Sequence, residues 1–264
     1  MRKYKIKFIK PTYHISNIKI PPLALLTLAT LTPRDKFDIE IIDGFVERIK
    51  IKKADVVAIT VSTIEAIKAY NIADAYRKKG AKVILGGIHA SFLPDEAIQH
   101  ADSVVIGEAE DIWADVLDDF CNGNLKRFYK PKKMPDMSDP PVVDYRFLKH
   151  RKYFLSAIQT TRGCPYNCEF CSVIAYNGRK QRHKPIEQVI EQIKHIKKVR
   201  KRKVEVLTIV DDNLTVDKSY AKALFKLAEG NISQAESHEK ALHTVNEIFT
   251  NPESGKILRS PIMP

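Results

Sequence analysis

The sequence predicts an α/β protein with a doubly wound, flavodoxin-like parallel sheet in its first half and further β/α units in its second half. Short β-branched or apolar runs alternate with helical patterns along the chain. Small and polar residues follow several of these runs, at the edge of a doubly wound sheet where ligands bind. Three closely spaced cysteines follow the strand that opens the second half.

The first half, residues 1–130, is expected to form one domain. We predict its strands at 5–10, 38–42, 56–60, 82–85 and 103–106, and its helices at 22–30, 64–79, 94–100 and 110–122. Strands that alternate with helices favour a parallel sheet covered on both faces.

Candidate ligand-binding residues follow three of these strands. They are Ser62 and Thr63 after the third, Gly86, Gly87 and His89 after the fourth, and Gly107 and Glu108 after the fifth. Glycines and short side chains allow a large ligand to approach the backbone closely. Each also has a plainer explanation, because glycine often serves turn geometry and a lone histidine more often caps or packs.

A proline-rich linker is predicted at 131–152. Its four prolines, Pro131, Pro135, Pro140 and Pro141, exclude a continuous helix and predict an exposed connection. Residues 153–230 then show strands at 153–161 and 204–210 and helices at 185–198 and 218–228. Asp211 and Asp212 end the second strand, where β/α barrels place reacting groups, although a helix N-cap is an equally good interpretation.

The cysteine loop is the most specific feature. Cys164, Cys168 and Cys171 lie in the run 160–171, TTRGCPYNCEFC. Structural iron-sulfur or zinc centres take four protein ligands, so three thiolates leave one coordination position open for a substrate or cofactor. With four cysteines in 264 residues and no secretory signal, a disulfide is not expected. Zinc would need His183 or His195 as a fourth ligand, and neither has a recognised finger spacing.

Charge and hydropathy argue against a nucleic-acid-binding protein and against a membrane protein. The net charge is +12, from 44 Lys and Arg against 32 Asp and Glu. Much of the excess falls at 179–203, on a predicted helix face and turn without interleaved aromatic residues, so we do not expect nucleic-acid binding. No apolar run reaches the roughly 18 residues of a membrane span, and we expect a cytoplasmic protein.

The spacing C-x3-C-x2-C, with Phe170 before the last cysteine, resembles the radical SAM superfamily. The resemblance implies a 4Fe-4S cluster on Cys164, Cys168 and Cys171, with S-adenosylmethionine on its fourth iron. It also implies that Phe170, Asp211 and Asp212 contact S-adenosylmethionine. The cofactor would supply a 5'-deoxyadenosyl radical that takes hydrogen from an unactivated carbon.

The segments 21–26, 86–89 and 107–108 and the flanks Thr-Arg-Gly-Cys-Pro and Gly178-Arg179 resemble the cobalamin-binding branch of this superfamily. That resemblance covers most of residues 1–230 and implies cobalamin contacts for the candidate residues after the strands: Ser62, Thr63, Gly86, Gly87, His89, Gly107 and Glu108. An Asp-x-His-x-x-Gly segment, which supplies a cobalt ligand in other cobalamin domains, is absent. Asp43-Gly44 and His14 do not reconstitute it.

The resemblance implies methyl transfer, or a rearrangement, on a small-molecule substrate, with ferredoxin or flavodoxin as electron donor. It stops at residue 231, so we expect a barrel of about two β/α units, an unrelated polar tail at 231–264 and a partner chain that completes the barrel. One alternative is a truncated or non-catalytic cluster-binding fragment, or half of a split enzyme. The other is an RNA methylthiotransferase-like protein, although no appended RNA-binding domain is apparent.

Overall fold

The computed structural model describes residues 3–12, 19–149, 152–201 and 206–229. The chain forms two compact units. The first contains residues 1–165 and 172–213, and the second contains 166–171 and 214–264. The predicted domain boundaries at 130 and 152 therefore stay a prediction, and the predicted tail at 231–264 lies outside the described residues.

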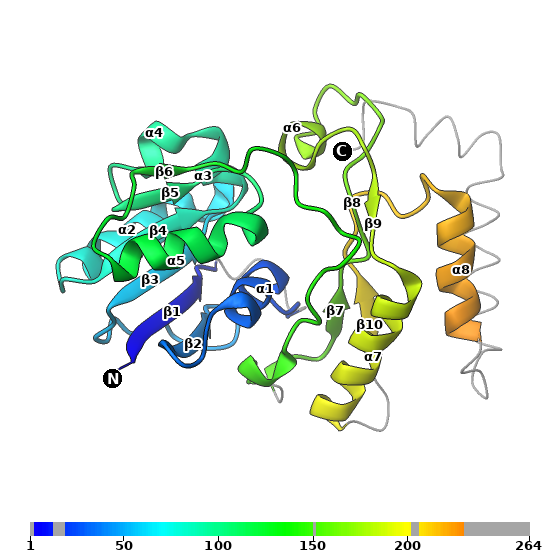
Figure 1. Cartoon of the computed structure of the whole chain (residues 1–264), viewed down its shortest axis with the longest axis horizontal. Helices are drawn as coiled ribbons and strands as arrows, with labels where there is room; N and C mark the ends of the chain where they lie inside the picture. Colours follow the sequence, from blue (N-terminus) through cyan, green and yellow to red (C-terminus); the bar gives the residue numbers. More distant parts are fainter. Residues whose placement is uncertain (1–2, 13–18, 150–151, 202–205, 230–264) are drawn as a thin grey trace. The chain divides into compact units, whose positions relative to one another are not determined.

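A six-stranded parallel sheet dominates the first unit (Figure 1). Its strands are β1 (Tyr4–Lys10), β2 (Phe37–Asp43), β3 (Val56–Thr60), β4 (Lys82–Gly86), β5 (Ser103–Val105) and β6 (Phe128–Tyr129). Their order is β2-β1-β3-β4-β5-β6, with β1 between β2 and β3. This order confirms the predicted doubly wound sheet, whose switch point lies between β1 and β3. The sequence did not predict β6.

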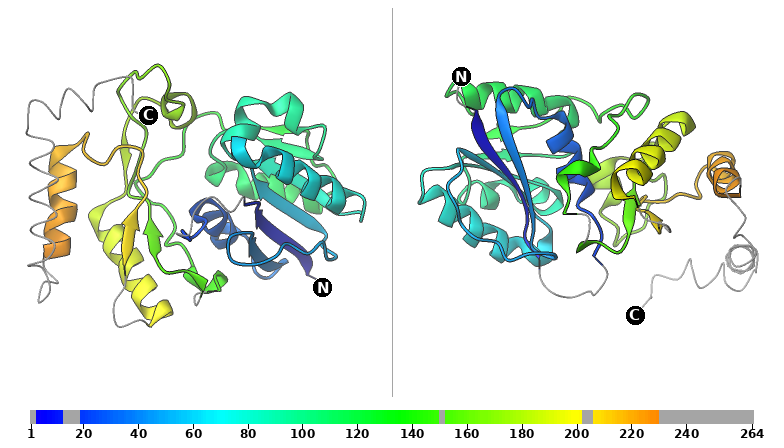
Figure 2. Two further views of the ribbon diagram at one scale, coloured as in Figure 1. Left: turned by 180° about the vertical axis from the view of Figure 1, so that it is seen from behind. Right: turned by 90° about the horizontal axis from the view of Figure 1, so that it is seen from below.

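Helices cover both faces of this sheet (Figure 2). Helices α1 (Leu23–Leu31) and α5 (Trp113–Cys121) lie on one face, while α2 (Ala66–Arg77), α3 (Ile88–Phe92) and α4 (Pro94–Ala97) lie on the other. The short 3-10 turns η1 (Thr63–Glu65) and η2 (Glu110–Ile112) precede α2 and α5. Two covered faces explain why the central strands β3 and β4 read as nearly continuous apolar runs.

Strand β3 shows how the two faces differ. Val57 and Ile59 are fully buried in a core with Ala69, Ala73 and other residues of α2. Alternate side chains of a strand point to opposite faces. The chain thus fills one face of the sheet with a closed core, whereas the other face, under α1 and α5, carries the cavity described below.

The predicted linker contains no α-helix in its described residues, but the prediction that it is exposed is wrong for its second half. Val143, Asp144 and Tyr145 are buried, and Tyr145 opens the turn η3 (Tyr145–Phe147). Asp144 accepts hydrogen bonds from Arg146 and from the Arg34 guanidinium. Burial alone would raise the pKa of this carboxyl, but the two arginines lower it well below its usual range. Proline content correctly excluded a helix but gave no information on these long-range contacts.

The remaining elements begin with β7 (Ser156–Ile158), which pairs in parallel with β10 (Leu207–Ile209). Between them, β8 (Thr161–Arg162) pairs antiparallel with β9 (Arg182–His183), so the predicted strand at 153–161 is two short strands. Helices α6 (Val173–Asn177) and α7 (Ile186–Arg200) belong to the first unit and α8 (Lys218–Glu229) to the second. In the described residues, no helix is long and apolar enough to cross a membrane.

Candidate functional site

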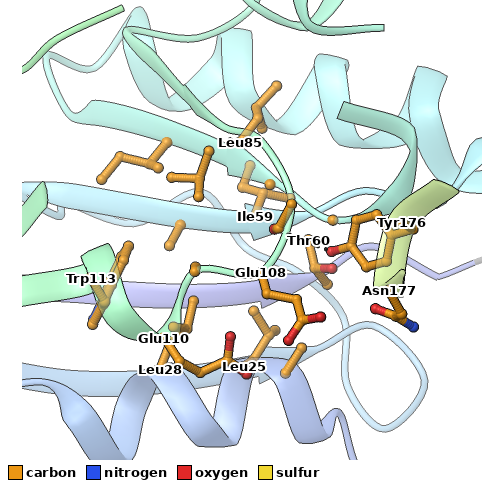
Figure 3. Close-up of a pocket in the computed structure, with 18 of the residues that line it drawn as sticks. Leu25, Leu28, Ile59, Thr60, Leu85, Glu108, Glu110, Trp113, Tyr176 and Asn177 are labelled. Carbon is orange, nitrogen blue, oxygen red and sulfur yellow. Dashed lines mark hydrogen bonds between the residues drawn. The ribbon is translucent and has the colours of Figure 1, made fainter. Parts of the chain in front are cut away.

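A cavity of about 200 Å³ lies at the carboxyl ends of β3, β4 and β5, against α1 (Figure 3). Leu25 and Leu28 of α1 and Trp113 of α5 form its apolar part. Tyr176 and Asn177 of α6 lie on the opposite side, with the Glu108 carboxylate near them. The cavity is therefore apolar at one end and polar at the other, as ligand pockets typically are.

Trp113 is the single tryptophan of the chain and is only 1% exposed. Its indole Nε1 donates a hydrogen bond to Thr32 Oγ1 over 2.9 Å. Because this bond satisfies the buried indole N–H, the ring is fixed with its apolar surface toward the cavity.

Gly87 directly follows β4 and lies beside the end of β3. A Cβ atom at this residue would stand 2.8 Å from Thr60 Oγ1 and 2.9 Å from the backbone nitrogen of Val61, and its φ is +93°. Only glycine fits both the contact and the left-handed backbone. The absence of a side chain at Gly86, Gly87 and Gly107 leaves this edge of the cavity open to a ligand.

The structure separates the predicted cobalamin residues into two groups. Gly86, Gly87, Gly107 and Glu108 line the cavity. Ser62, Thr63 and His89 follow the same strand ends but do not line it. Ser62 donates to Glu65, and the buried His89 ring lies 3.3 Å from Thr63 Oγ1 and 3.3 Å from Glu96 Oε1. The role of all seven residues in cobalamin binding stays a prediction.

A buried charge cluster borders the polar end. Glu108, whose side chain is 3% exposed, accepts hydrogen bonds from Arg162 over 2.6 Å and from Arg182. Arg162 also pairs with Glu110 over 2.7 Å. Arg182 donates in addition to the carbonyl oxygen of Pro135 over 2.7 Å. Buried charges of this kind are tolerated because every one has an opposite partner.

The pKa values of Glu110, Arg162 and Tyr176 are shifted by burial and by their charged neighbours. Burial by itself would raise the pKa of Glu110, but the adjacent Arg162 outweighs burial and lowers it. The pKa of Arg162 is raised, because the charges of Glu110 and Glu108 outweigh the opposite effect of burial. Burial, followed by the two glutamate charges, raises the pKa of Tyr176 to about 12, so this phenol stays protonated at neutral pH.

Asp211 and Asp212, the predicted S-adenosylmethionine residues, accept hydrogen bonds from the segment that leads to the first cysteine. Asp211 accepts from the backbone nitrogen of Thr160 over 2.6 Å and from the Thr161 hydroxyl over 3.0 Å. Asp212 Oδ2 accepts from the backbone nitrogen of Gly163 and from Asn177 Nδ2, each over 2.8 Å. Neither carboxylate caps α8, which begins at Lys218. Their contact with S-adenosylmethionine stays a prediction.

The three cysteines are free thiols. Cys164 belongs to the first compact unit, and Cys168 and Cys171 belong to the second. In the described part of the chain, no three His, Cys, Asp or Glu side chains are gathered as a metal site. The fit to an iron-sulfur cluster therefore depends on the donor set, three unpaired thiols in one short loop. Phe170, between the second and third cysteines, is 79% exposed.

Several residues that build this site could not be assigned from the sequence. Arg162 was quoted only as part of a motif, and Arg182, Trp113, Tyr176 and Asn177 were given no role. A signal for Arg162 existed, since it lies two residues before Cys164. No local signal indicates Arg182, which reaches Glu108 across 74 residues of sequence.

Two family models match the chain. The B12 binding domain model matches residues 16–117, and the Radical SAM superfamily model matches residues 158–257. The first match contains α1, the strands β3, β4 and β5 and Trp113 at the cavity, and the second contains the cysteine loop and α6. The second also continues beyond residue 230, where the sequence analysis expected the resemblance to stop.

Curated relatives include two methyltransferases of Chlorobaculum tepidum. The bacteriochlorophyllide d C-8(2)-methyltransferase is 37% identical over 223 residues, which are 79% of this chain and 48% of that enzyme. The bacteriochlorophyllide d C-12(1)-methyltransferase is 33% identical over 214 residues, 78% of this chain and 46% of that enzyme. The chain thus spans about half the length of these relatives.

A solved structure shares the fold. It is the radical S-adenosylmethionine methyltransferase TsrM from Kitasatospora setae with cobalamin and a 4Fe-4S cluster bound, at a TM-score of 0.63 and 17% identity. The match covers 85% of this chain and 50% of that one. The matched domains imply three cofactors, which are cobalamin, a 4Fe-4S cluster and S-adenosylmethionine. The chain therefore belongs to the radical SAM superfamily, in the branch that carries a B12-binding domain.

Proposed function

We propose that this protein transfers a methyl group by radical chemistry to an unactivated carbon of a small-molecule substrate. The observation that supports this most directly is that one compact unit carries both the cavity of the B12-binding domain and the first cysteine of the cluster loop. Both Chlorobaculum relatives are named as methyltransferases. When bound, the cluster and S-adenosylmethionine supply the radical and cobalamin supplies the methyl group.

The cavity would hold part of the cobalamin molecule. At about 200 Å³ it is smaller than the ~300–1,000 Å³ of sites that enclose a drug-sized ligand. Its apolar end, formed by Leu25, Leu28 and Trp113, suits a flat heterocycle, and the glycine edge admits a bulky ligand above the strand ends. Ser62, Thr63 and His89 follow the same strand ends and are proposed as outer contacts.

The cysteine loop would hold the cluster through Cys164, Cys168 and Cys171. Phe170 is proposed to contact S-adenosylmethionine, since its exposed ring is available to a ligand. Of the two aspartates, Asp212 suits such a contact better. Both of its internal hydrogen bonds go to Oδ2, whereas both carboxylate oxygens of Asp211 accept from the preceding strands.

The electron donor, the cellular compartment and the partner of this protein are proposals as well. Cluster chemistry needs a one-electron donor, for which we propose a ferredoxin or flavodoxin, in the cytoplasm. Because the chain spans about half the length of its curated relatives, we propose that a partner chain or further sequence completes the substrate wall. The competing function is a protein that binds the cluster without turnover.

Trp113 provides a direct test of cobalamin binding. Corrins absorb in the range where tryptophan emits, so hydroxocobalamin should quench the emission of this single, cavity-lining tryptophan in a saturable way. In Gly86→Val, a side chain fills the open edge of the cavity, and we expect the affinity to fall at least about tenfold, or ~1.4 kcal/mol. Ile67→Ala, at a 72% exposed residue of α2, is the folding control.

Cluster binding and turnover need a second experiment. After anaerobic reconstitution with iron and sulfide, the protein should show a brown chromophore that Cys168→Ala abolishes. Incubation with S-adenosylmethionine and a strong reductant should then release 5'-deoxyadenosine. A stable cluster with no cleavage of S-adenosylmethionine would favour the non-catalytic function, and four-coordinate zinc in place of iron would refute the radical assignment.

A further inference from the structure

Three successive residues after β10 contact three successive points on the approach to the first cysteine. Asp211 contacts Thr160 and Thr161, Asp212 contacts Gly163, and Asn213 contacts Cys164. In the last contact the side-chain Nδ2 of Asn213 donates to Cys164 Sγ over 3.8 Å. Bonds to sulfur are longer than bonds to oxygen because sulfur is the larger atom. The segment 211–213 therefore lies alongside 160–164, and its side chains contact that segment one after another.

Both ends of the Asn213 to Cys164 bond are fixed by their own backbone contacts. The carbonyl oxygen of Asn213 accepts a hydrogen bond from Gln181 Nε2 over 2.6 Å. The backbone nitrogen of Cys164 donates to the carbonyl oxygen of Gly178 over 3.1 Å. Gly163 has φ +87°, and a Cβ there would meet the Lys180 carbonyl oxygen at 2.4 Å. The amide and the sulfur are thus held toward each other.

We propose that Asn213 is a positioning residue of the iron-sulfur cluster: its amide orients the Cys164 sulfur and raises the reduction potential of the cluster. This inference depends on the cluster of the proposed function. Once Cys164 is a thiolate ligand, the bond becomes charge-assisted and stronger. One-electron reduction adds negative charge that the sulfurs share, so an N–H donor stabilises the reduced cluster more than the oxidised one.

The test compares cluster potentials in the full chain after anaerobic reconstitution. Asn213→Leu keeps the approximate size of the side chain and removes the donor. At a fixed solution potential we expect the ratio of reduced to oxidised cluster to fall about tenfold, which is about 59 mV for a one-electron couple. Asn213→Asp places an ionised acceptor beside the sulfur and should lower the ratio at least as much. This variant replaces Asn213→Leu in the test if the leucine variant does not fold.

Gln188→Leu is the matched control. This variant also removes a side-chain amide that donates a hydrogen bond, but the amide of Gln188 reaches Asp139 over 2.9 Å and not the sulfur. We expect its ratio of reduced to oxidised cluster to stay within about twofold of the wild type, because no contact with a cluster ligand is lost. A shift equal to that of Asn213→Leu would overturn a direct role of Asn213.

A measurement on the wild-type cluster is independent of stability. Pulsed EPR of the reduced cluster in D2O should detect an exchangeable deuteron at a cysteine sulfur that Asn213→Leu lacks. Identical spectra, or potentials that do not differ, would overturn the inference while leaving the cluster in place. If the wild-type protein takes up no cluster at all, the proposed function fails, and this inference fails with it.

Discussion

Glu108→Gln provides the most direct test of the buried charge cluster beside the cavity. Glutamine has almost the same shape as glutamate, so the substitution removes a charge without opening a void. In the native protein the carboxylate forms ion pairs with two guanidinium groups, those of Arg162 and Arg182, whose side chains are 15% and 12% exposed. After the substitution both cations remain buried with less compensating charge.

Removal of one partner from a buried ion pair costs about 3–5 kcal/mol. The lower end applies here because each cation keeps other acceptors. Arg162 retains Glu110 at 2.7 Å and Gln159 at 2.8 Å, and Arg182 retains the Pro135 carbonyl at 2.7 Å. We therefore expect Glu108→Gln to lower the free energy of unfolding by about 3 kcal/mol.

The assay is urea unfolding followed by far-UV circular dichroism. Asp118→Asn is the control, because Asp118 pairs with Lys36 at side-chain exposures of 63% and 52%, where salt and water screen the charges. We expect this control to unfold at the wild-type midpoint. If Glu108→Gln lowers the unfolding free energy no more than Asp118→Asn does, the buried cluster does not stabilise the protein as argued.

Two further predictions concern stability. Gly87→Ala should cost about 1–3 kcal/mol of unfolding free energy, through backbone strain and the blocked contact with β3, and should weaken cobalamin quenching of tryptophan emission. Burial, followed by the charge of Arg162, lowers the pKa of Lys184 from 10.5 to about 8, although Asp211 and Glu110 act in the opposite direction. Between these values the unfolded chain binds more protons, so stability should rise with pH by at most about 1.4 kcal/mol per unit from this group. Lys184→Met should reduce that slope in unfolding curves measured from pH 8 to 10.5, and an unchanged slope would contradict the assignment.

Most of the sheet could be predicted because its signals are local. In β3, residues 56–59 are all apolar, as expected of a strand that is buried on both faces. Strand β6 has two residues, Phe128 and Tyr129, between polar segments, and two residues carry no periodicity. The break between β7 and β8 could not be predicted because its cause is not local. It is stabilised by Asp211, which accepts a hydrogen bond from the backbone nitrogen of Thr160 across 51 residues of sequence.

The residues of the candidate site also fall into a group with a local signal in the sequence and a group without one. Gly86, Gly87 and Gly107 could be predicted because a glycine at the end of a parallel strand is visible in the sequence and its consequence is local. Arg162 and Arg182 reach Glu108 across 54 and 74 residues. A sequence with many exposed lysines and arginines gives no sign of which two are buried, because burial of a cation is decided by partners distant in the chain.

Glu108 lines the cavity, and its carboxylate accepts hydrogen bonds from two guanidinium groups. Its role in cobalamin binding stays a prediction. We therefore expect a ligand at this strand end to contact mainly the backbone of Gly107 and Glu108. The carboxylate contributes by fixing Arg162, two residues before Cys164, so that the edge of the cavity and the start of the cysteine loop share one buried charge pair. We therefore expect a substitution at Glu108 to alter both the edge of the cavity and the start of the cysteine loop, because Arg162 connects them.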